Sequence, residues 1–207
     1  MFHPLELTTD DGELLTDLES INRFLAWQHS KVWPLDLGDL PPEVRVALDT
    51  ENTTSRQAEL VLRHFLLPRD RLLGLIAECG REPQVPGGGA LETHVLPHDY
   101  DYPHLFEIHA GDRITTYDVF HSNRAEDGTG VDEIVQMLRG QGLLMRHRLP
   151  DGAEWSLRMS CPGPEQGWLS TYEGSHPHIG SPADAAAGSK FLVQVIGPPI
   201  WTMEYLD

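Results

Sequence analysis

The segment of residues 92–109, ETHVLPHDYDYPHLFEIH, contains four histidines and four acidic residues, and His121 follows it shortly afterwards. Imidazole and carboxylate groups are ligands for zinc, iron, nickel and manganese, and they also exchange protons near neutral pH. Two or three histidines and one carboxylate around a metal with open coordination positions form a catalytic non-haem site. This segment therefore indicates either a metal site or a general acid–base site.

Short β-strands would be needed to bring these side chains together. Residues two or four apart in a strand point to the same face. Glu107 would then share a face with His109, and Tyr117 would share one with His121. If the strands are neighbours, their side chains meet in one cavity. On this interpretation the predicted metal ligands are His94, His98, Glu107, His109 and His121, with Glu92 as a spare ligand.

Two kinds of chemistry remain open for this cluster. One divalent transition metal (iron, zinc, nickel or manganese) would polarise a bound oxygen or activate water or dioxygen, as in a metal-dependent oxygenase. Without a metal, a histidine and a carboxylate would act as general acid and base, as in a lyase or an isomerase. The sequence has no HExxH and no GxSxG motif, so it indicates neither a zinc-peptidase helix nor a serine nucleophile. The predicted catalytic residues are His109, Glu107, Tyr117 and His121.

Arginines gather around a predicted hairpin at 143–160, whose turn contains Pro-Asp-Gly at 150–152. A helix followed by such a hairpin is also found in nucleic-acid-binding modules, but the net charge of −17 weighs against a polyanionic partner. We predict instead that these groups bind a carboxylate or phosphate on a small substrate. The alternative, in which the arginines pair with surface acids, stays open. The predicted substrate-binding residues are Arg113, Arg146, Arg148, Arg158 and Tyr102.

The elements that must position these residues fall into two parts. Residues 1–80 are predicted to form a helical N-terminal segment, with helices within 11–30, 42–49, 53–67 and 69–79. Residues 81–90 form a Pro/Gly linker. Residues 91–207 form a β-rich domain with one helix at 129–140, which would begin at Thr129 and end at Gly140. The predicted strands are 91–96, 104–109, 113–121, 143–149, 154–160, 168–173, 191–196 and 200–205.

This order of elements predicts an α+β fold. The helical N-terminal segment would pack on a mainly antiparallel β-sheet or small β-barrel, and the two parts would form one compact unit. A chain of 207 residues is long enough to bury a sizeable core. Residues 174–190, which include His176 and His178, are predicted to be a long loop.

The composition limits the setting in which the chain works. No apolar run approaches the roughly 20 residues that span a bilayer, and the acidic N-terminus lacks the features of a signal peptide. We therefore expect a cytoplasmic protein without membrane contact, in which Cys79 and Cys161 are reduced thiols.

Two classes of function follow from these observations. The leading hypothesis is a small enzyme that acts on a small polar organic molecule. The alternative is a non-catalytic binding protein or accessory subunit, whose acidic surface would meet a basic protein partner. The sequence leaves the oligomeric state open.

Overall fold

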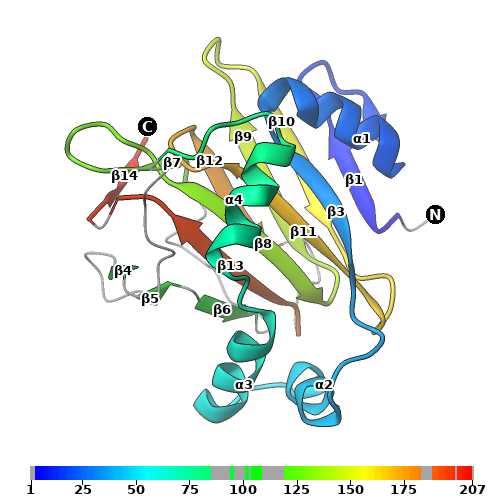
Figure 1. The fold of residues 1–207 in the computed structure, drawn as a ribbon. Coiled ribbons are helices and arrows are strands. Elements are labelled where there is room, and N and C mark those ends of the chain that lie inside the picture. Colours follow the sequence, from blue (N-terminus) through cyan, green and yellow to red (C-terminus); the bar gives the residue numbers. More distant parts are fainter. Residues whose placement is uncertain are drawn as a thin grey trace.

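Two antiparallel β-sheets lie face to face and make up most of the molecule (Figure 1). The computed structural model describes residues 3–84, 104–108, 119–181, 188–198 and 200–206, and it describes the backbone alone at 94–95, 101–102 and 182. The larger sheet has seven strands. Their order across the sheet is β14 (Thr202–Tyr205), β7 (His121–Arg124), β12 (His178–Pro182), β9 (Leu143–Arg148), β10 (Glu154–Met159), β1 (Leu5–Thr8) and β2 (Leu14–Leu15).

The smaller sheet has five strands. Their order is β3 (Lys31–Asp36), β11 (Gln166–Glu173), β8 (Asp132–Arg139), β13 (Lys190–Ile196) and β6 (His104–Glu107). A separate short hairpin joins β4 (His94–Val95) to β5 (Asp101–Tyr102).

The inner faces of the two sheets enclose the main hydrophobic core. Buried and partly exposed residues alternate along β9 and β10, as expected for strands with one face toward a core. Met145 and Leu157 of the larger sheet belong to the same buried cluster as Met137 and Val193 of the smaller one. The prediction of an α+β fold with antiparallel sheets is confirmed. Among the described strands the two sheets do not join into a closed barrel.

Local sequence signals set the ends of the helices α1 (Leu18–Leu25), α2 (Pro42–Asp49), α3 (Ser55–Phe65) and α4 (Arg69–Glu78). Pro42 occupies the first turn of α2, where its fixed φ suits the helix. Thr54 and Gln57 form a capping box at the start of α3, because each side chain bonds the other's backbone N–H. Gly80 follows α4 with a φ of +73°, a left-handed conformation that favours glycine.

Helices α2, α3 and α4 lie on the outer side of the five-stranded sheet (Figure 1). Leu72 and Ile76 of α4 pack against Ile134 of β8. Side chains of α2 and α3 pack against Leu138 of β8 and Leu192 of β13. Strand β8 therefore has helices on one face and the larger sheet on the other, and almost every residue in it is buried.

The predicted helix at 129–140 is wrong, because these residues contain the central strand β8. This strand pairs with β11 on one side and β13 on the other. A strand buried on both faces carries a nearly continuous apolar sequence, which periodicity alone does not separate from a buried helix. Gly140, interpreted as a helix stop, has a φ of +91° and ends the strand in a turn. The apolar positions that suggested the helix are Val131, Ile134, Val135 and Leu138.

The first eighty residues are not wholly helical. They also contain β1, β2 and β3, and these strands pair with each other or with β10 and β11 of the C-terminal part. The helix predicted within 11–30 is reduced to α1 and one 3-10 turn, Ala26–Gln28. Both sheets thus combine strands from the two sides of the predicted linker, of which only 81–84 is described.

Most of the predicted strands are present in the sheets. The predictions at 104–109, 143–149, 154–160, 168–173, 191–196 and 200–205 match β6, β9, β10, β11, β13 and β14. In the predicted strand 91–96, the structure has β4 at His94–Val95. For the predicted strand 113–121, residues 113–118 lie outside the described part of the chain. Strand β12 was missed, because 174–190 was interpreted as a loop.

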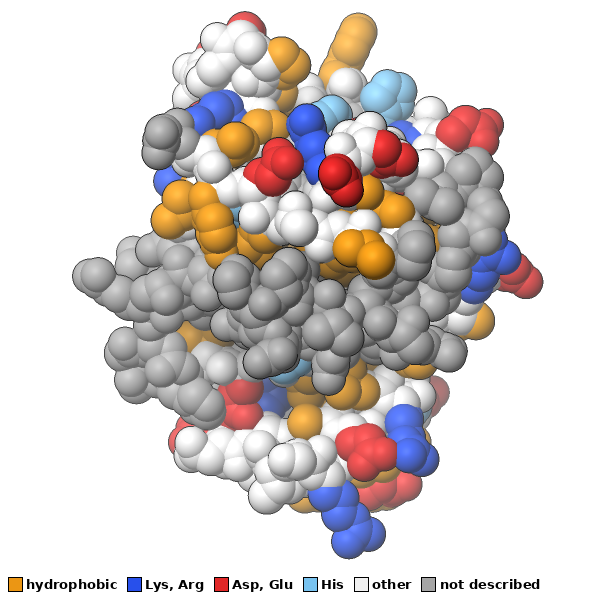
Figure 2. All heavy atoms as spheres, turned by 90° about the vertical axis from the view of Figure 1, so that its left-hand side faces the viewer, with side chains coloured by type: hydrophobic (Ala, Val, Ile, Leu, Met, Phe, Trp, Pro, Cys, Tyr) orange, Lys and Arg blue, Asp and Glu red, His pale blue; other side chains and the backbone are white. Residues whose placement is uncertain are grey.

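The described surface mixes charged and apolar side chains. On the face shown in Figure 2, acidic and basic side chains are interspersed with hydrophobic ones. The net charge of −17 therefore does not gather into one continuous acidic patch among the side chains described on that face. In the described part of the chain, no helix has the length and apolar character needed to cross a membrane.

Candidate metal centre

Three histidines form a row across neighbouring strands of the seven-stranded sheet. His121 of β7 lies directly opposite His178 of β12, and His178 lies directly opposite His147 of β9. Residues directly opposite each other in antiparallel strands share one face of the sheet, so the three rings come together. The ring centroids of His121 and His178 are 4.4 Å apart, and those of His178 and His147 are 5.9 Å apart. All three side chains are buried.

The facing sheet supplies a carboxylate to this row. Glu133 of β8 places Oε1 at 3.2 Å from Nε2 of His178. Tyr172, which lies opposite Glu133 on β11, donates its hydroxyl to Oε2 at 2.9 Å. Asn123 of β7 donates its amide to Oε1 at 2.6 Å. The Glu133 carboxylate is thus held by partners from both sheets, and we call His121, His147, His178 and Glu133 the His–Glu cluster.

Backbone carbonyls fix the rings of two of these histidines. Nδ1 of His121 lies 2.9 Å from the carbonyl oxygen of Val119, and Nδ1 of His178 lies 2.7 Å from that of His176. A carbonyl oxygen only accepts, so in each ring Nδ1 carries the proton and donates it. Nε2 is then the nitrogen left to accept a proton or bind a metal, as in protein metal sites where Nδ1–H bonds a carbonyl.

Burial and the Glu133 charge separate the pKa values in the cluster. Burial alone would raise the pKa of Glu133, but the neighbouring His178 outweighs it and lowers that pKa to about 2. Burial alone would lower the pKa of His178, but the Glu133 carboxylate raises it above its usual value. Burial, together with the charge on His178, lowers the pKa of His121 to about 4. The same two causes lower the pKa of His147 well below 6.5. At neutral pH, His121 and His147 are therefore uncharged, whereas the Glu133 carboxylate favours the protonated form of His178.

The buried neutral histidines predict a loss of stability in mild acid. Unfolded histidine takes up a proton near pH 6.5, whereas folded His121 does so only near pH 4. The unfolded state then binds more protons, so stability falls with pH across this window, by about 3 kcal/mol for His121 alone. Urea unfolding of the metal-free protein between pH 7 and about 4.5 measures this loss.

A substitution isolates the His121 contribution to this profile. His178 acts in the opposite sense, but only above pH 6.5, and Glu133 loses its contribution only as the pH falls from 4.5 toward 2. The His121→Gln variant should therefore show a clearly shallower decline than the wild type. An equally steep decline in both proteins would contradict the assignment.

A small cavity lies between the row of histidines and the facing sheet. Its volume is about 30 Å³, which is enough for one or two water molecules or a metal ion. His121, His178, Glu133 and Tyr172 border it, and apolar side chains such as Phe191 form the remaining walls. Within the described residues, no three histidine, cysteine or acidic side chains are already placed at metal-binding distances from one point.

Gly174 lies so close to Glu133 that it leaves no space for a side chain. A Cβ atom at this position would lie 2.5 Å from Oε1 of Glu133 and 2.9 Å from Val131. The Gly174→Ala variant should therefore displace the Glu133 carboxylate and lower the free energy of unfolding by about 1–3 kcal/mol. Urea unfolding measures the effect, and Gly163→Ala, at a site with open space around it, is the matched control. Equal stability of the two variants would show that Glu133 is not held in this place.

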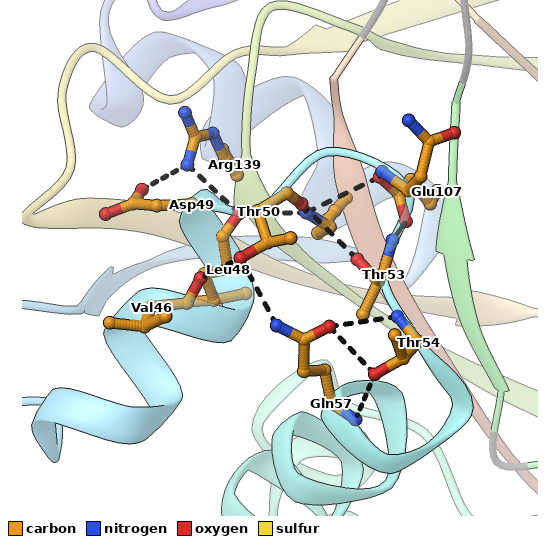
Figure 3. Close-up of polar contacts among 11 residues, drawn as sticks. Val46, Leu48, Asp49, Thr50, Thr53, Thr54, Gln57, Glu107 and Arg139 are labelled. Carbon is orange, nitrogen blue, oxygen red and sulfur yellow. Dashed lines mark hydrogen bonds and ion pairs between the residues drawn. The ribbon is translucent and has the colours of Figure 1, made fainter.

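Glu107, a predicted ligand and catalytic residue, does not join the His–Glu cluster. Its carboxylate accepts hydrogen bonds from the backbone N–H groups of Asn52 and Thr53, each at 2.7 Å (Figure 3). Buried Lys190 lies 3.6 Å from Oε1 and also donates to the carbonyls of Leu48 and Thr50. These contacts fasten the connection between α2 and α3 to β6 and β13. The role of Glu107 in the structure is therefore to hold this connection.

The predicted arginines on the hairpin have acidic partners. Arg146 and Arg148 both pair with Glu154, at 2.5 and 3.2 Å, and Arg158 pairs with Glu6 at 3.4 Å. The guanidinium of Arg148 also lies 3.9 Å from the ring centroid of Phe120. These contacts match the alternative left open from the sequence, in which the arginines pair with surface acids. Arg148 nevertheless borders a second cavity, together with Arg124 and Trp155.

Several predicted site residues lie outside the described part of the structure. For His94 and Tyr102 the backbone alone is described, in β4 and β5. The roles assigned to these residues stay predictions. The other predicted residues outside the described ranges are Glu92, His98, His109, Arg113 and Tyr117.

Of the predicted site residues whose side chains are described, only His121 lies in the His–Glu cluster. His178 was missed because its HPH sequence was placed in a loop, whereas strand β12 begins at His178. Glu133 was missed because β8 was interpreted as a helix. His147 alternates with Arg146 and Arg148 in LLMRHR, and the buried positions of that alternation include 147. That alternation could have identified His147 as an inward-facing residue.

No family model matches this chain. Isoleucine–tRNA ligases of two strains of Mycobacterium tuberculosis are 33% identical to it over 107 residues, which is 48% of this chain and 9% of the ligase. Because the chain spans so little of the ligase, this match does not carry over the ligase activity.

Among solved structures, the chain is similar to acireductone dioxygenase from Bacillus anthracis with a cadmium ion in its active centre. The TM-score is 0.58 at 11% sequence identity, and the similarity covers 97% of this chain and 95% of that one. At this identity the similarity shows a shared fold, an arrangement of antiparallel sheets of the cupin-like kind.

Proposed function

We propose that the chain is a small metal-dependent enzyme, in which Nε2 of His121, Nε2 of His178 and the Glu133 carboxylate hold one divalent transition metal. The observation that carries the proposal is the state of His178. Its Nε2 atom is buried and makes no hydrogen bond of normal geometry to any described group, although Oε1 of Glu133 is only 3.2 Å away. A buried nitrogen in this state suits a cation that would lie between the imidazole and the carboxylate.

The chemistry of the donor groups fits this proposal. Two imidazoles and one carboxylate with open positions are the ligand set of non-haem iron(II) oxygenases. Carbonyl bonds to Nδ1 keep Nε2 of His121 and His178 available, and Tyr172 and Asn123 orient Glu133. Metal binding would release the proton from Nε2 of His178, so the affinity should rise with pH.

We infer that the enzyme is an oxygenase that acts on a small organic molecule. A bound metal would supply the activation of dioxygen or of a substrate oxygen. The chain's own residues form the walls of the site. Phe191 and other apolar side chains limit access of water, and the Tyr172 hydroxyl donates its proton in a hydrogen bond to Oε2 of Glu133. The shared fold with a protein named as a dioxygenase with a metal ion in its active centre supports this inference.

A metal-free acid–base function is the second candidate, because one observation favours it. Glu133 Oε1 and His178 Nε2 already lie 3.2 Å apart in a buried site, and Tyr172 donates a hydrogen bond to the same carboxylate. Such a pair moves protons to and from a bound substrate, as in lyases and isomerases.

Metal binding by site variants tests the proposal. The metal-free protein is titrated with Fe²⁺ without oxygen, and with Zn²⁺, in an isothermal calorimeter. The wild type should bind one ion, and His121→Ala and His178→Ala should each weaken binding by more than about 100-fold, since even residues that only support ligands change metal affinity 10–100-fold. His64→Ala, which removes an exposed histidine on α3, is the control and should bind as the wild type does. Full binding by both site variants would contradict the proposal.

Nitric oxide separates the two candidate functions without knowledge of the substrate. Nitric oxide binds iron(II) at open coordination positions, as dioxygen does, and gives a characteristic electron paramagnetic resonance signal. The iron-loaded wild type should give this signal and His178→Ala should not. A protein that binds no metal gives no signal in either case, and that result would favour the acid–base function.

A further inference from the structure

A second cavity lies against the other end of the row of histidines. Its volume is about 270 Å³, compared with about 30 Å³ for the cavity beside Glu133. Tyr172 borders both cavities, and His147 borders the larger one. Only the larger cavity has room for an organic molecule, and it is just below the range of drug-sized pockets. A ligand in it would touch the side chains that contact His178 and Glu133.

One cation on the wall of this cavity has no acidic partner. Arg124, at the end of β7, donates from Nε and Nη2 to the carbonyl oxygen of Ser175, at 3.3 and 2.7 Å. Among the described residues it forms no ion pair, whereas Arg148 on the same wall is paired with Glu154. In a chain with a net charge of −17, a half-buried arginine without a carboxylate is a ready partner for an anionic ligand.

Trp155 on the same wall carries a buried hydrogen-bond donor that lacks a partner among the described residues. The side chain of Trp155 is 3% exposed, and no described group accepts a hydrogen bond from its Nε1. Its ring stacks on His147, with centroids 4.2 Å apart and an interplanar angle of 11°. Leaving a buried N–H unpaired costs free energy, and a ligand acceptor that reaches Nε1 would recover it.

The rest of the wall combines apolar and polar side chains. Leu149, Pro150 and Pro177 are its apolar part, and Gln28, Ser30, Glu173 and His176 are its remaining polar part. A ligand that fits these walls has one anionic group for Arg124 and Trp155, and an apolar body.

We propose that this cavity binds a small organic monocarboxylate, with Arg124 and the indole N–H of Trp155 as donors to its carboxylate. That this molecule is the substrate rests on the proposed function, because contact with His147 and Tyr172 places it next to the proposed metal ligands. Binding itself does not depend on a metal. The two proposals can therefore fail separately.

Benzoate, and its neutral analogue benzamide, are the probes for a test in metal-free protein. Binding is followed by calorimetry and by nuclear magnetic resonance of the Trp indole N–H signals. The wild type should bind benzoate about 10–100-fold more tightly than benzamide, as expected for a charge-assisted hydrogen bond. The indole signal of Trp155, identified by its loss in Trp155→Phe, should shift when benzoate binds.

Variants complete the test. Arg124→Gln should remove most of the preference for benzoate over benzamide, and Arg23→Gln, which changes an exposed arginine on α1, should keep it. No saturable binding of benzoate by the wild type, or an unchanged preference in Arg124→Gln, would overturn the proposal. If Trp155→Phe does not fold, the benzoate preference of Arg124→Gln, compared with that of the wild type, still tests the proposal. Benzoate binding in a chain that binds no metal would leave the carboxylate site standing and reject the metal site.

Discussion

The Glu133→Gln variant is expected to lose metal binding, with a drop in affinity of more than about 100-fold. Glutamine keeps the size of the side chain and can still accept the Tyr172 hydrogen bond, but it removes the charge between the two sheets. The charge is what pairs with His178 and what would neutralise a bound cation. Calorimetric titration of the metal-free variant with Zn²⁺ measures the effect.

The same variant changes the titration of His178. The Glu133 carboxylate holds the pKa of His178 above its usual value against the opposing effect of burial. Without that charge burial dominates, so the pKa of His178 should fall below 6.5, which nuclear magnetic resonance can follow. Glu126→Gln removes an exposed acid in the turn after β7 and should change neither property. Unchanged metal affinity in Glu133→Gln would exclude this residue as a ligand.

The Asp132→Ala variant is expected to lose about 3–5 kcal/mol of unfolding free energy, because it leaves a buried guanidinium unpaired. Asp132 forms an ion pair with Arg81 in which the two side chains are 0% and 5% exposed. It also accepts the backbone N–H of Gln84 at 2.9 Å. The pair fastens the chain after α4 to the start of β8, one residue before Glu133. Urea unfolding measures the loss.

Two comparisons separate the ion pair from a general effect of the substitution. Asp49→Ala breaks an ion pair with Arg139 in which both side chains are more than a third exposed, and it should cost at most about 1 kcal/mol. Burial raises the pKa of Asp132 even with Arg81 beside it, which shows that the buried carboxylate is costly. Asp132→Ala should therefore cost much less when Arg81→Met is already present. An equal cost in both backgrounds would contradict the account.

The elements predicted well from the sequence are those with local signals. The boundaries of α2, α3 and α4 follow from Pro42, the capping box at Thr54, and Gly80. Hairpin strands such as β9 and β10 follow from alternation and a Pro-Asp-Gly turn. In each case the residues that determine the structure lie within a few positions of one another.

Strand β8 could not be predicted in the same way, because its partners are remote in the sequence. Asp132 pairs with Arg81, Glu133 with His178, and Gln136 donates to the carbonyl of Phe65. Without these partners, polar residues at 132, 133 and 136 look like the exposed side of a helix. The three-dimensional arrangement makes them buried polar groups with partners in the core.

The candidate site could not be predicted for the same reason, because its residues come from strands that are remote in the sequence. The row of histidines depends on the register of β7, β12 and β9, which brings positions 121, 178 and 147 to one line. Composition drew attention to 92–109, where histidines are dense, but density in the sequence does not set register. His121 was identified because a strand placed it on an inward face. His147 and His178 required knowledge of which strands are neighbours.

The most direct test of the central claim is a crystal structure of the metal-loaded protein, with the ion located by its anomalous scattering. The account predicts one strong peak within about 2.0–2.2 Å of Nε2 of His121, Nε2 of His178 and an oxygen of Glu133. Glu133 would then have exchanged its contact with His178 for the metal. A peak at any other place, or an unchanged His178–Glu133 pair at saturating metal, would contradict the assignment of this cluster as a metal centre.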